Sequence, residues 1–333
     1  SGASALLIAV SDIEENMKAA KHSIESYSMK IDEGKKKNTQ KKRMPVIYVS
    51  KELANEIMRN SPYTIEELKK KIKETKTPVY AESKAKIKIR ATKKEEHVSS
   101  ENVLGYIEGS DLKNELVVIT AHYDHLGVHD GKVFNGADDD GSGTASILEL
   151  AEAFAQAKKD GHGPRRSVLI MPVSGEEKGL LGSSYYANNP VFPLAQTVCN
   201  LNIDMVGRVD AQHKDSADYV YIIGSDFLSK DLHRINEEAN VTYTDLELDY
   251  RYNDIKDKNR FYFRSDHYNF AKNNIPAIFY FNGTHEDYHK ETDEVTKIDF
   301  GVMEKRAKLV FYTAWELANR AERIKNDNPQ KDK

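Results

Sequence analysis

The sequence predicts an α/β protein: a three-layer α/β/α domain with a mostly parallel central sheet, preceded by a smaller N-terminal α+β portion. Two observations support this prediction. After about residue 95, short apolar runs alternate with long segments of helical periodicity, as in a parallel sheet covered by helices. Before residue 95 the elements are short and dense in Lys and Glu. We therefore expect three regions: 1–95, 96–325 and a polar tail at 326–333.

The first region carries signals for strands and for two helices. The expected strands are Ala5–Val10, Met44–Val49 and an alternating edge strand, Ala85–Ala91. Ser50 is the expected N-cap of a helix over Lys51–Met58, and the capping-box pattern that begins at Thr64 starts a second helix, through about residue 73. The basic block Gly34–Arg43 is interpreted as a solvated loop, with a nucleic-acid or lipid patch as the alternative.

Apolar runs in the second region predict buried strands, because strands covered on both faces are apolar throughout. The runs are Leu116–Thr120, Ser167–Val173, Val198–Ile203, Val220–Gly224 and Pro276–Phe281. Thr144–Lys159, between the first two runs, places its apolar residues on one helical face, and Met303–Ile324 repeats that stripe. We expect both helices to pack on the sheet.

Composition excludes several classes of protein. Lys and Arg (49) nearly balance Asp and Glu (53), which argues against a dedicated nucleic-acid binder. No apolar run approaches the about 20 residues that cross a bilayer. The single Cys199 rules out an internal disulfide framework and a cysteine-based zinc finger. The chain opens at Ser1 with neither an initiator Met nor a signal segment, so we expect a processed or truncated product.

Acids and histidines follow four of the apolar runs. They are His122 and Asp124, Glu176 and Glu177, Asp204, and His285 and His289, and a glycine-rich loop adds Asp138, Asp139 and Asp140. Open α/β sheets bind ligands at the carboxyl ends of their strands, so these side chains are expected to converge. Convergence of imidazoles and carboxylates predicts a metal site.

The donor types favour zinc, and less exclusively manganese, cobalt or iron. Two histidines and at least three acids exceed the needs of one catalytic zinc, which suggests two ions sharing a carboxylate, about 3.5–4 Å apart. Asp124 shares a strand face with His122 and is expected to accept its second ring proton. Taken alone, the His122–Asp124 motif could instead be a surface salt bridge. Taken alone, Glu176 and Glu177 could instead be two solvated acids at the start of a helix.

Five motifs in order resemble the co-catalytic di-zinc aminopeptidase family, which includes bacterial leucyl aminopeptidases, glutamate carboxypeptidase and the catalytically dead transferrin receptor. The motifs are AHYDHLG, GADDDGSG, SGEEKGLLGS, NIDMVG and DYHKETD, and the resemblance covers about residues 100–320. It implies a zinc metallo-aminopeptidase that hydrolyses N-terminal residues from peptides by means of a metal-bridging water. Glu176 would be the general base, and Tyr288 would hold the developing oxyanion.

The same resemblance implies a ligand set for two Zn²⁺ ions, which Co²⁺ or Mn²⁺ could replace. One ion would be held by His122 and Asp204, the other by Glu177 and His289, with Asp139 bridging them and a cis peptide bond following it. The family spacing selects His289 over His285, which becomes a loop histidine. Supporting roles fall to His125 near the first motif, to Ser265, Asp266 and His267 around the site, and to Asp293 beside the His289 loop.

The first ninety-odd residues resemble part of a protease-associated domain, through GASALLIAV and MPVIYVSKELANEIM. Such a module would shape substrate access. The family is mostly exported, so a periplasmic or secreted location is expected by resemblance.

Three other functions compete with an aminopeptidase. A carboxypeptidase acting on acidic dipeptides needs an arginine cluster, for which Arg251, Arg260 and Arg264 are candidates. Glutaminyl cyclase is a single-zinc relative, which the complete five-ligand set disfavours. A receptor-like module without catalysis is disfavoured by the intact Glu176 and metal ligands. Side-chain preference and oligomeric state stay open.

Overall fold

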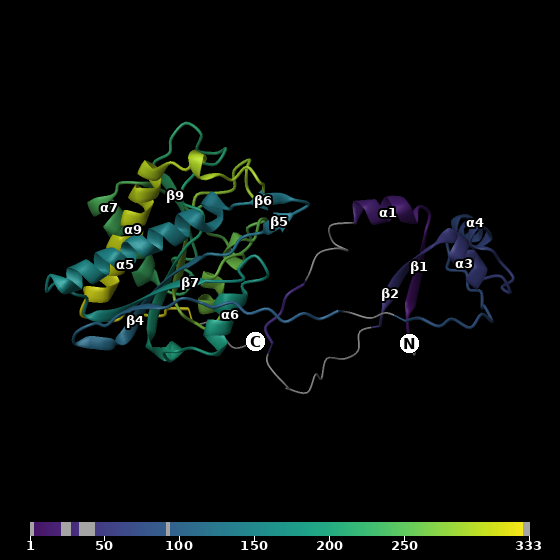
Figure 1. Ribbon diagram of the computed structural model, residues 1–333, viewed down its shortest axis with the longest axis horizontal. Helices are drawn as coiled ribbons and strands as arrows, with labels where there is room; N and C mark the ends of the chain where they lie inside the picture. The colour runs from purple at the N-terminus through teal and green to yellow at the C-terminus, as the bar shows by residue number, and fades with distance from the viewer. Residues whose placement is uncertain (1–2, 21–27, 33–43, 91–93, 329–333) are drawn as a thin grey trace. The chain divides into compact units, whose positions relative to one another are not determined.

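The computed structural model describes residues 3–20, 28–32, 44–90 and 94–328. It divides the chain into two compact units, one of residues 1–28 and 32–98, the other of residues 29–31 and 99–333. The smaller unit runs from purple to blue in Figure 1, and the larger from blue through yellow. The basic block Gly34–Arg43 lies outside the described residues.

The smaller unit contains a two-stranded parallel sheet, in which β1 (Leu6–Val10) pairs with β2 (Val46–Ser50). Its helices are α1 (Ile13–Ala19), α3 (Lys51–Ile57) and α4 (Ile65–Thr75). The caps are as predicted: Ser50 accepts a hydrogen bond from the amide of Leu53, and Thr64 and Glu67 form a capping box. Two of the three predicted strands and both predicted helices are therefore confirmed.

The predicted edge strand Ala85–Ala91 is wrong over its described residues, 85–90, which form no strand and are exposed. Ile87 and Ile89 retain 49% and 43% of their accessible surface. Alternation specifies two faces of a strand, but a strand forms only where a neighbour supplies the backbone hydrogen bonds, and residues 85–90 pair with none of the described strands.

The larger unit is built on a seven-stranded sheet of order β10-β9-β11-β8-β4-β7-β3. The strands are β3 (Gly105–Ile107), β4 (Leu112–His122), β7 (Arg166–Val173), β8 (Thr197–Ile203), β9 (Tyr219–Ile223), β10 (Glu247–Asp249) and β11 (Ala277–Phe281). Neighbouring strands are parallel except where β9 meets β11 and where β3 meets β7. The mostly parallel sheet is thus confirmed.

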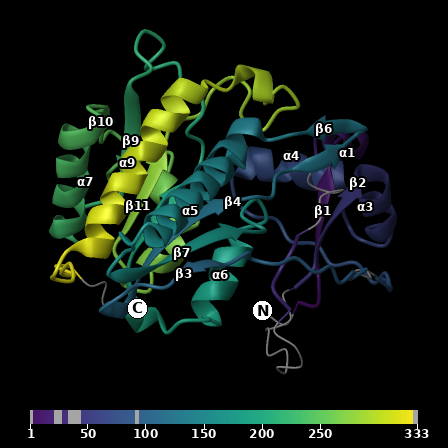
Figure 2. The same cartoon turned by 60° about the vertical axis from the view of Figure 1, so that its left-hand side comes forward.

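Helices cover both faces of this sheet (Figures 1 and 2). One face carries α5 (Gly143–Lys159), α7 (Lys230–Tyr243) and α9 (Phe300–Asn319), and the other α6 (Leu181–Asn188) and α8 (His267–Ala271). Alternation along β4 produces the layers: Val117 and Ile119 share a core with α5 and α9, whereas Val118 shares one with Tyr186 and Phe270. The predicted three layers are present.

The last helix differs from its expected bounds, Met303–Ile324. It begins one residue after its N-cap Asp299 and ends at Asn319, because Arg320 is extended. Ile324 is nevertheless buried in the same core, so the apolar stripe continues beyond the helix that starts it. None of the described helices is long and apolar enough to cross a bilayer.

Shorter elements complete the larger unit. They are a hairpin of β5 (Gly127–His129) and β6 (Lys132–Phe134), a π-helical turn η1 (Ala137–Ser142), and 3₁₀ turns at Leu194–Gln196, Phe261–Phe263 and Val295–Lys297. The hairpin and η1 lie between β4 and α5 in the chain, and η1 carries the three consecutive aspartates. A cis peptide bond joins Asp139 to Asp140, as the resemblance implied.

Candidate metal centre

Four neighbouring strands, β11, β8, β4 and β7, run parallel, so their carboxyl ends share one edge of the sheet. His122 is the last residue of β4, and Asp204 directly follows β8. Glu176 and Glu177 follow β7, and His289 lies in the loop after β11. Sheet order therefore explains why residues 122 to 289 can meet at one point.

Asp139 lies between two pairs of these side chains. Its Oδ1 is 3.3 Å from Nε2 of His122, which in turn is 3.6 Å from Oδ1 of Asp204. Its Oδ2 is 3.1 Å from Nε2 of His289, which is 3.3 Å from Oε1 of Glu177. We call the His122–Asp204 pair the strand half-site and the Glu177–His289 pair the loop half-site.

The atoms that face one another here fit a metal ion. His122 Nε2, Asp139 Oδ2 and Glu177 Oε1 are all buried without a hydrogen-bond partner, although each has an oppositely charged atom nearby. Buried polar atoms without partners are costly and rare. Donors about 2.0–2.2 Å from one tetrahedral zinc lie about 3.3–3.6 Å apart, close to the 3.1–3.6 Å found here. The arrangement suits side chains that bind a common metal ion rather than side chains that hydrogen-bond to one another.

The strand half-site is held by surrounding groups. Nδ1 of His122 lies 2.9 Å from the main-chain oxygen of Asp124. The expected acceptor, the Asp124 carboxylate, is 3.8 Å from that nitrogen and accepts instead from the amide of Glu176, at 3.1 Å. The Ser265 hydroxyl donates to Oδ2 of Asp204 at 2.6 Å, so Ser265 orients a predicted ligand without being one.

The two other aspartates of η1 have separate partners. Asp140 accepts from the amides of His122, Gly143 and Met205 at 2.9–3.2 Å, which joins β4 to the end of β8. Asp138 accepts from the Ser142 hydroxyl and the Gly207 amide. Both carboxylates are therefore occupied by the protein itself, and Asp139 alone of the three faces both half-sites.

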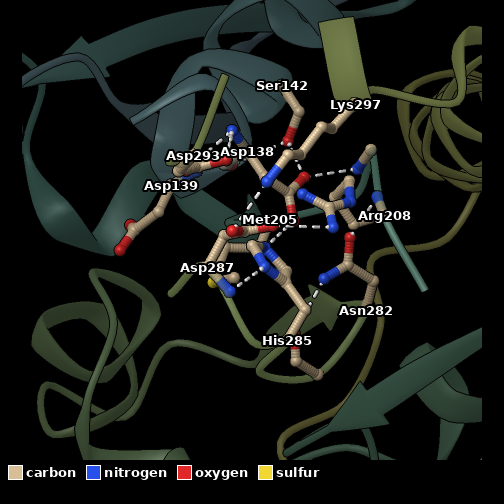
Figure 3. Close-up of polar contacts among 12 residues, drawn as sticks. Asp138, Asp139, Ser142, Met205, Arg208, Asn282, His285, Asp287, Asp293 and Lys297 are labelled. Carbon is tan, nitrogen blue, oxygen red and sulfur yellow. Dashed lines mark hydrogen bonds and ion pairs between the residues drawn. The ribbon is translucent and has the colours of Figure 1, made fainter. Parts of the chain in front are cut away.

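His285 and Asp293 tie the loop after β11 to η1 (Figure 3). His285, expected to be a loop histidine, is buried, and its Nε2 lies 3.1 Å from Oδ2 of Asp138. Its Nδ1 accepts from the amide of Asp287, which leaves Nε2 as the protonated nitrogen. Asp293 accepts from the amides of Asp138 and Asp139. In Figure 3 the Asp139 carboxylate points away from this network.

The same loop is anchored by charges on its other side. Asp287 contacts Arg208 at 3.1 Å and Lys297 at 2.7 Å, and it accepts from the Thr292 hydroxyl at 2.6 Å. Hydrogen bonds from Lys297, Thr292 and Arg208 hold the pKa of Asp287 well below its usual value. The segment that carries His289 is thus fixed to β8, η1 and the start of α9.

Glu176 and Tyr288 border the site. Burial raises the pKa of Glu176 well above its usual value, and the nearby Asp204, Asp266 and Glu177 carboxylates add to it, while His122 opposes it. The Tyr288 ring stacks on His289 with centroids 3.9 Å apart. Its hydroxyl oxygen accepts from Arg264 at 3.0 Å. Arg251, in contrast, is paired with Asp249, and Arg260 lies over Phe263.

Two further histidines lie near the site. The loop histidine His285 contacts Asp138, and Nδ1 of His125 lies 3.0 Å from Oε1 of Glu177. The sequence could not reveal the contact of His285 with Asp138, because the two residues are 147 positions apart in the chain. For His125, the available sequence signal was its position directly after the His122–Asp124 motif.

Comparisons with known proteins identify the family of this chain. The profile of peptidase family M28 matches residues 102–314. A "Probable zinc metalloprotease" of Pyrenophora teres f. teres is 30% identical over 66% of this chain and 52% of its own. "Leucine aminopeptidase 1" of Penicillium rubens is 29% identical over 61% and 52%. The solved Legionella pneumophila LapA aminopeptidase superposes with a TM-score of 0.54 and 27% identity, over 66% and 55%.

The larger unit therefore combines an α/β sheet with a cluster of histidine and carboxylate side chains at the carboxyl ends of its strands. The chain belongs to peptidase family M28, since the matched residues make up more than half of its length. It spans about half the length of the curated relatives it matches.

Proposed function

We propose that this chain is a zinc-dependent aminopeptidase that hydrolyses N-terminal residues from peptides with two ions in its site. The observation that supports this most is the position of Asp139, whose two carboxylate oxygens face different histidines, His122 and His289. A carboxylate shared in this way is typical of two-metal hydrolases. The names of two relatives, zinc metalloprotease and leucine aminopeptidase, agree with it.

The strand half-site would hold one ion through His122 and Asp204, and the loop half-site another through Glu177 and His289, with Asp139 common to both. When bound, such ions polarise a scissile carbonyl and lower the pKa of water to about 7. Everything else in the reaction falls to the chain's own side chains.

Glu176 is the proton carrier of the proposed reaction. Its carboxylate takes the proton of the attacking water and returns it to the leaving amine nitrogen. Its raised pKa in the metal-free protein suits the first step, because a carboxylate with a higher pKa is a stronger base.

Tyr288 is suited to stabilise the oxyanion of the substrate. Arg264 can only donate, so the tyrosine oxygen accepts that hydrogen bond and its own O–H stays available for another acceptor. Placed beside His289, this donor would meet the negative charge that develops on the carbonyl oxygen.

Removal of amino-terminal rather than carboxyl-terminal residues is favoured by the arginines. A carboxypeptidase for acidic dipeptides requires several free guanidinium groups at the site. Arg251 is committed to Asp249, and of the three candidates Arg264 alone contacts a predicted site residue, Tyr288.

The proposal extends to the chain's organisation and location. Residues 96–325 would form the catalytic domain, and residues 1–95 a partial protease-associated-like domain that shapes substrate access. Export to the periplasm or the medium is proposed on the family resemblance alone.

The test is turnover of aminoacyl chromogenic substrates by the metal-loaded protein, alongside dipeptides blocked at either end. Glu176→Gln should reduce kcat by about 10²–10⁴-fold while two ions stay bound. Glu149→Gln, an exposed change on α5, is the matched control and should leave kcat unchanged. Near-normal turnover by Glu176→Gln would refute its role as the base. Cleavage of only amino-blocked dipeptides would refute the aminopeptidase assignment.

A further inference from the structure

His125 lies beside the loop half-site with no role in the ligand set described so far. Its Nδ1 is 3.0 Å from Oε1 of Glu177 and 3.9 Å from Oδ2 of Asp139. These are the same two oxygens that face Nε2 of His289. The His125 and His289 rings meet edge to face, with centroids 5.9 Å apart. Two imidazoles therefore approach one pair of carboxylate oxygens.

The contact between His125 and Glu177 is short but is not a hydrogen bond. Both ring nitrogens of His125 are buried without a hydrogen-bond partner, and so is Oε1 of Glu177. A histidine that served only to orient Glu177 would donate to it along the N–H direction. Close donor atoms that are not aligned with each other are instead what ligands of a common ion show.

The backbone makes room for this ring. Gly136 has a φ of +62°, and a Cβ added there would lie 2.4 Å from Cγ of His125 and 2.2 Å from the main-chain oxygen of Asp139. Any larger residue would push the imidazole or the Asp139 segment away. Gly136, the residue before η1, thus keeps His125 and Asp139 side by side.

We propose that His125 is a further metal ligand, which gives the loop half-site four protein donors: His125, Asp139, Glu177 and His289. This inference rests on the proposed two-metal function. Four donors are the complement of a closed zinc site, whereas His122, Asp139 and Asp204 would leave the strand half-site with an open position. The two half-sites would then differ in kind: the loop ion held mainly by protein, the strand ion more open to substrate.

The test compares wild-type protein with His125→Ala and the control His162→Ala. His162 is exposed just beyond the C-terminal end of α5, and the other end of α5 adjoins η1. The length of α5 therefore separates His162 from η1 by about 25 Å. Each protein is stripped of metal, checked for an unchanged circular dichroism spectrum, and titrated with Co²⁺ by calorimetry and visible absorption. These readouts do not depend on turnover.

We expect wild-type protein and His162→Ala to bind two ions. His125→Ala should bind one of them with a dissociation constant raised by more than the about 10–100-fold that loss of an outer-shell partner costs. It should also change that ion's d–d absorption, because a nitrogen ligand is lost, and added imidazole should restore the band.

Two outcomes would overturn the inference, and they are distinguishable. If His125→Ala bound both ions with wild-type spectra, His125 would not be a ligand, and the proposed function would stand. If wild-type protein itself bound fewer than two ions, the proposed two-metal function would fail and this inference with it.

Discussion

The two half-sites of the metal centre use similar ligands but are held by different parts of the chain. The strand half-site sits on backbone that belongs to the sheet, and His122 retains only 1% of its side-chain exposure. The loop half-site depends on His289, which is 37% exposed and adopts a φ of +56° in the loop after β11. Sheet hydrogen bonds fix the first, whereas side-chain contacts of the loop fix the second.

This difference shows how two half-sites with similar ligands can be held in place by different kinds of contact. Asp140 and Ser265 connect the strand half-site to a main-chain amide and to a hydroxyl group. The loop half-site is fastened through Asp293 and the Asp138–His285 pair, which connect two loops to each other. We therefore expect the strand half-site to be preformed and the loop half-site to tighten when metal binds.

The largest effect is expected from Asp139→Asn, which removes charge from both half-sites at once. Because each oxygen of Asp139 faces a different histidine, both dissociation constants should rise by at least about 100-fold. Peptidase activity should fall to background. Calorimetry with Zn²⁺ on metal-free protein measures this, and a variant that lost only one ion would show that Asp139 is not shared.

Next in size, His122→Ala and His289→Ala should each leave one ion bound, but with different effects on folding. His122 is buried and bonded to the main chain, so its loss should also lower the free energy of unfolding of the metal-free protein by about 1–3 kcal/mol. His289 is partly exposed, so its variant should unfold within about 0.5 kcal/mol of wild type. Urea unfolding in chelator tests this; equal losses of stability would remove the distinction between the half-sites.

Much of this comparison was foreseeable from the sequence, and the rest was not, for physical reasons. Donors at the ends of apolar runs could be placed at one sheet edge, because parallel strands that neighbour one another end together. The pairing of His285 with Asp138 could not be predicted, since Asp138 comes from a loop whose path no periodicity encodes. The prediction of a strand at 85–90 was wrong for a related reason, because alternation of apolar and polar residues does not show whether a partner strand exists.

Prediction of a hydrogen-bond acceptor from sequence is also weak where the main chain and the side chain of one residue both offer an oxygen. Asp124 was expected to receive the His122 ring proton on its carboxylate, and the nearest acceptor is its own main-chain oxygen. Both oxygens belong to the same residue, two positions beyond the histidine and just past the end of β4. Only the turn after β4, set by tertiary contacts, decides which oxygen comes closer.

A moderate effect is expected from pH. Burial alone would lower the pKa of His289, but the Asp139 and Glu177 carboxylates outweigh it and raise that pKa to about 9 in the metal-free protein. Below pH 9 this imidazole is protonated, and a metal ion must displace the proton to bind. Affinity at the loop half-site should therefore rise as pH increases, about tenfold per unit per proton released, and level off above about 9.

Calorimetry in buffers of different ionisation enthalpy would count the released protons. His289→Ala should bind its remaining ion with one proton fewer released in total. If wild-type affinity were independent of pH between 6 and 8, then His289 would not be a ligand in competition with protons.

The smallest effects are expected from groups that hold ligands without touching metal, and they should separate by half-site. Ser265→Ala removes the hydrogen bond to Asp204, so it should weaken the strand ion by about 10-fold and leave the loop ion unchanged. His285→Ala removes the contact between Asp138 and the loop that carries His289, so it should do the reverse. Ser110→Ala, exposed before β4, is the control for both. Competitive titration against a chelator resolves changes of this size. If each variant weakened both ions equally, the two half-sites would behave as one unit, and the contrast between strand and loop support would have no consequence for metal binding.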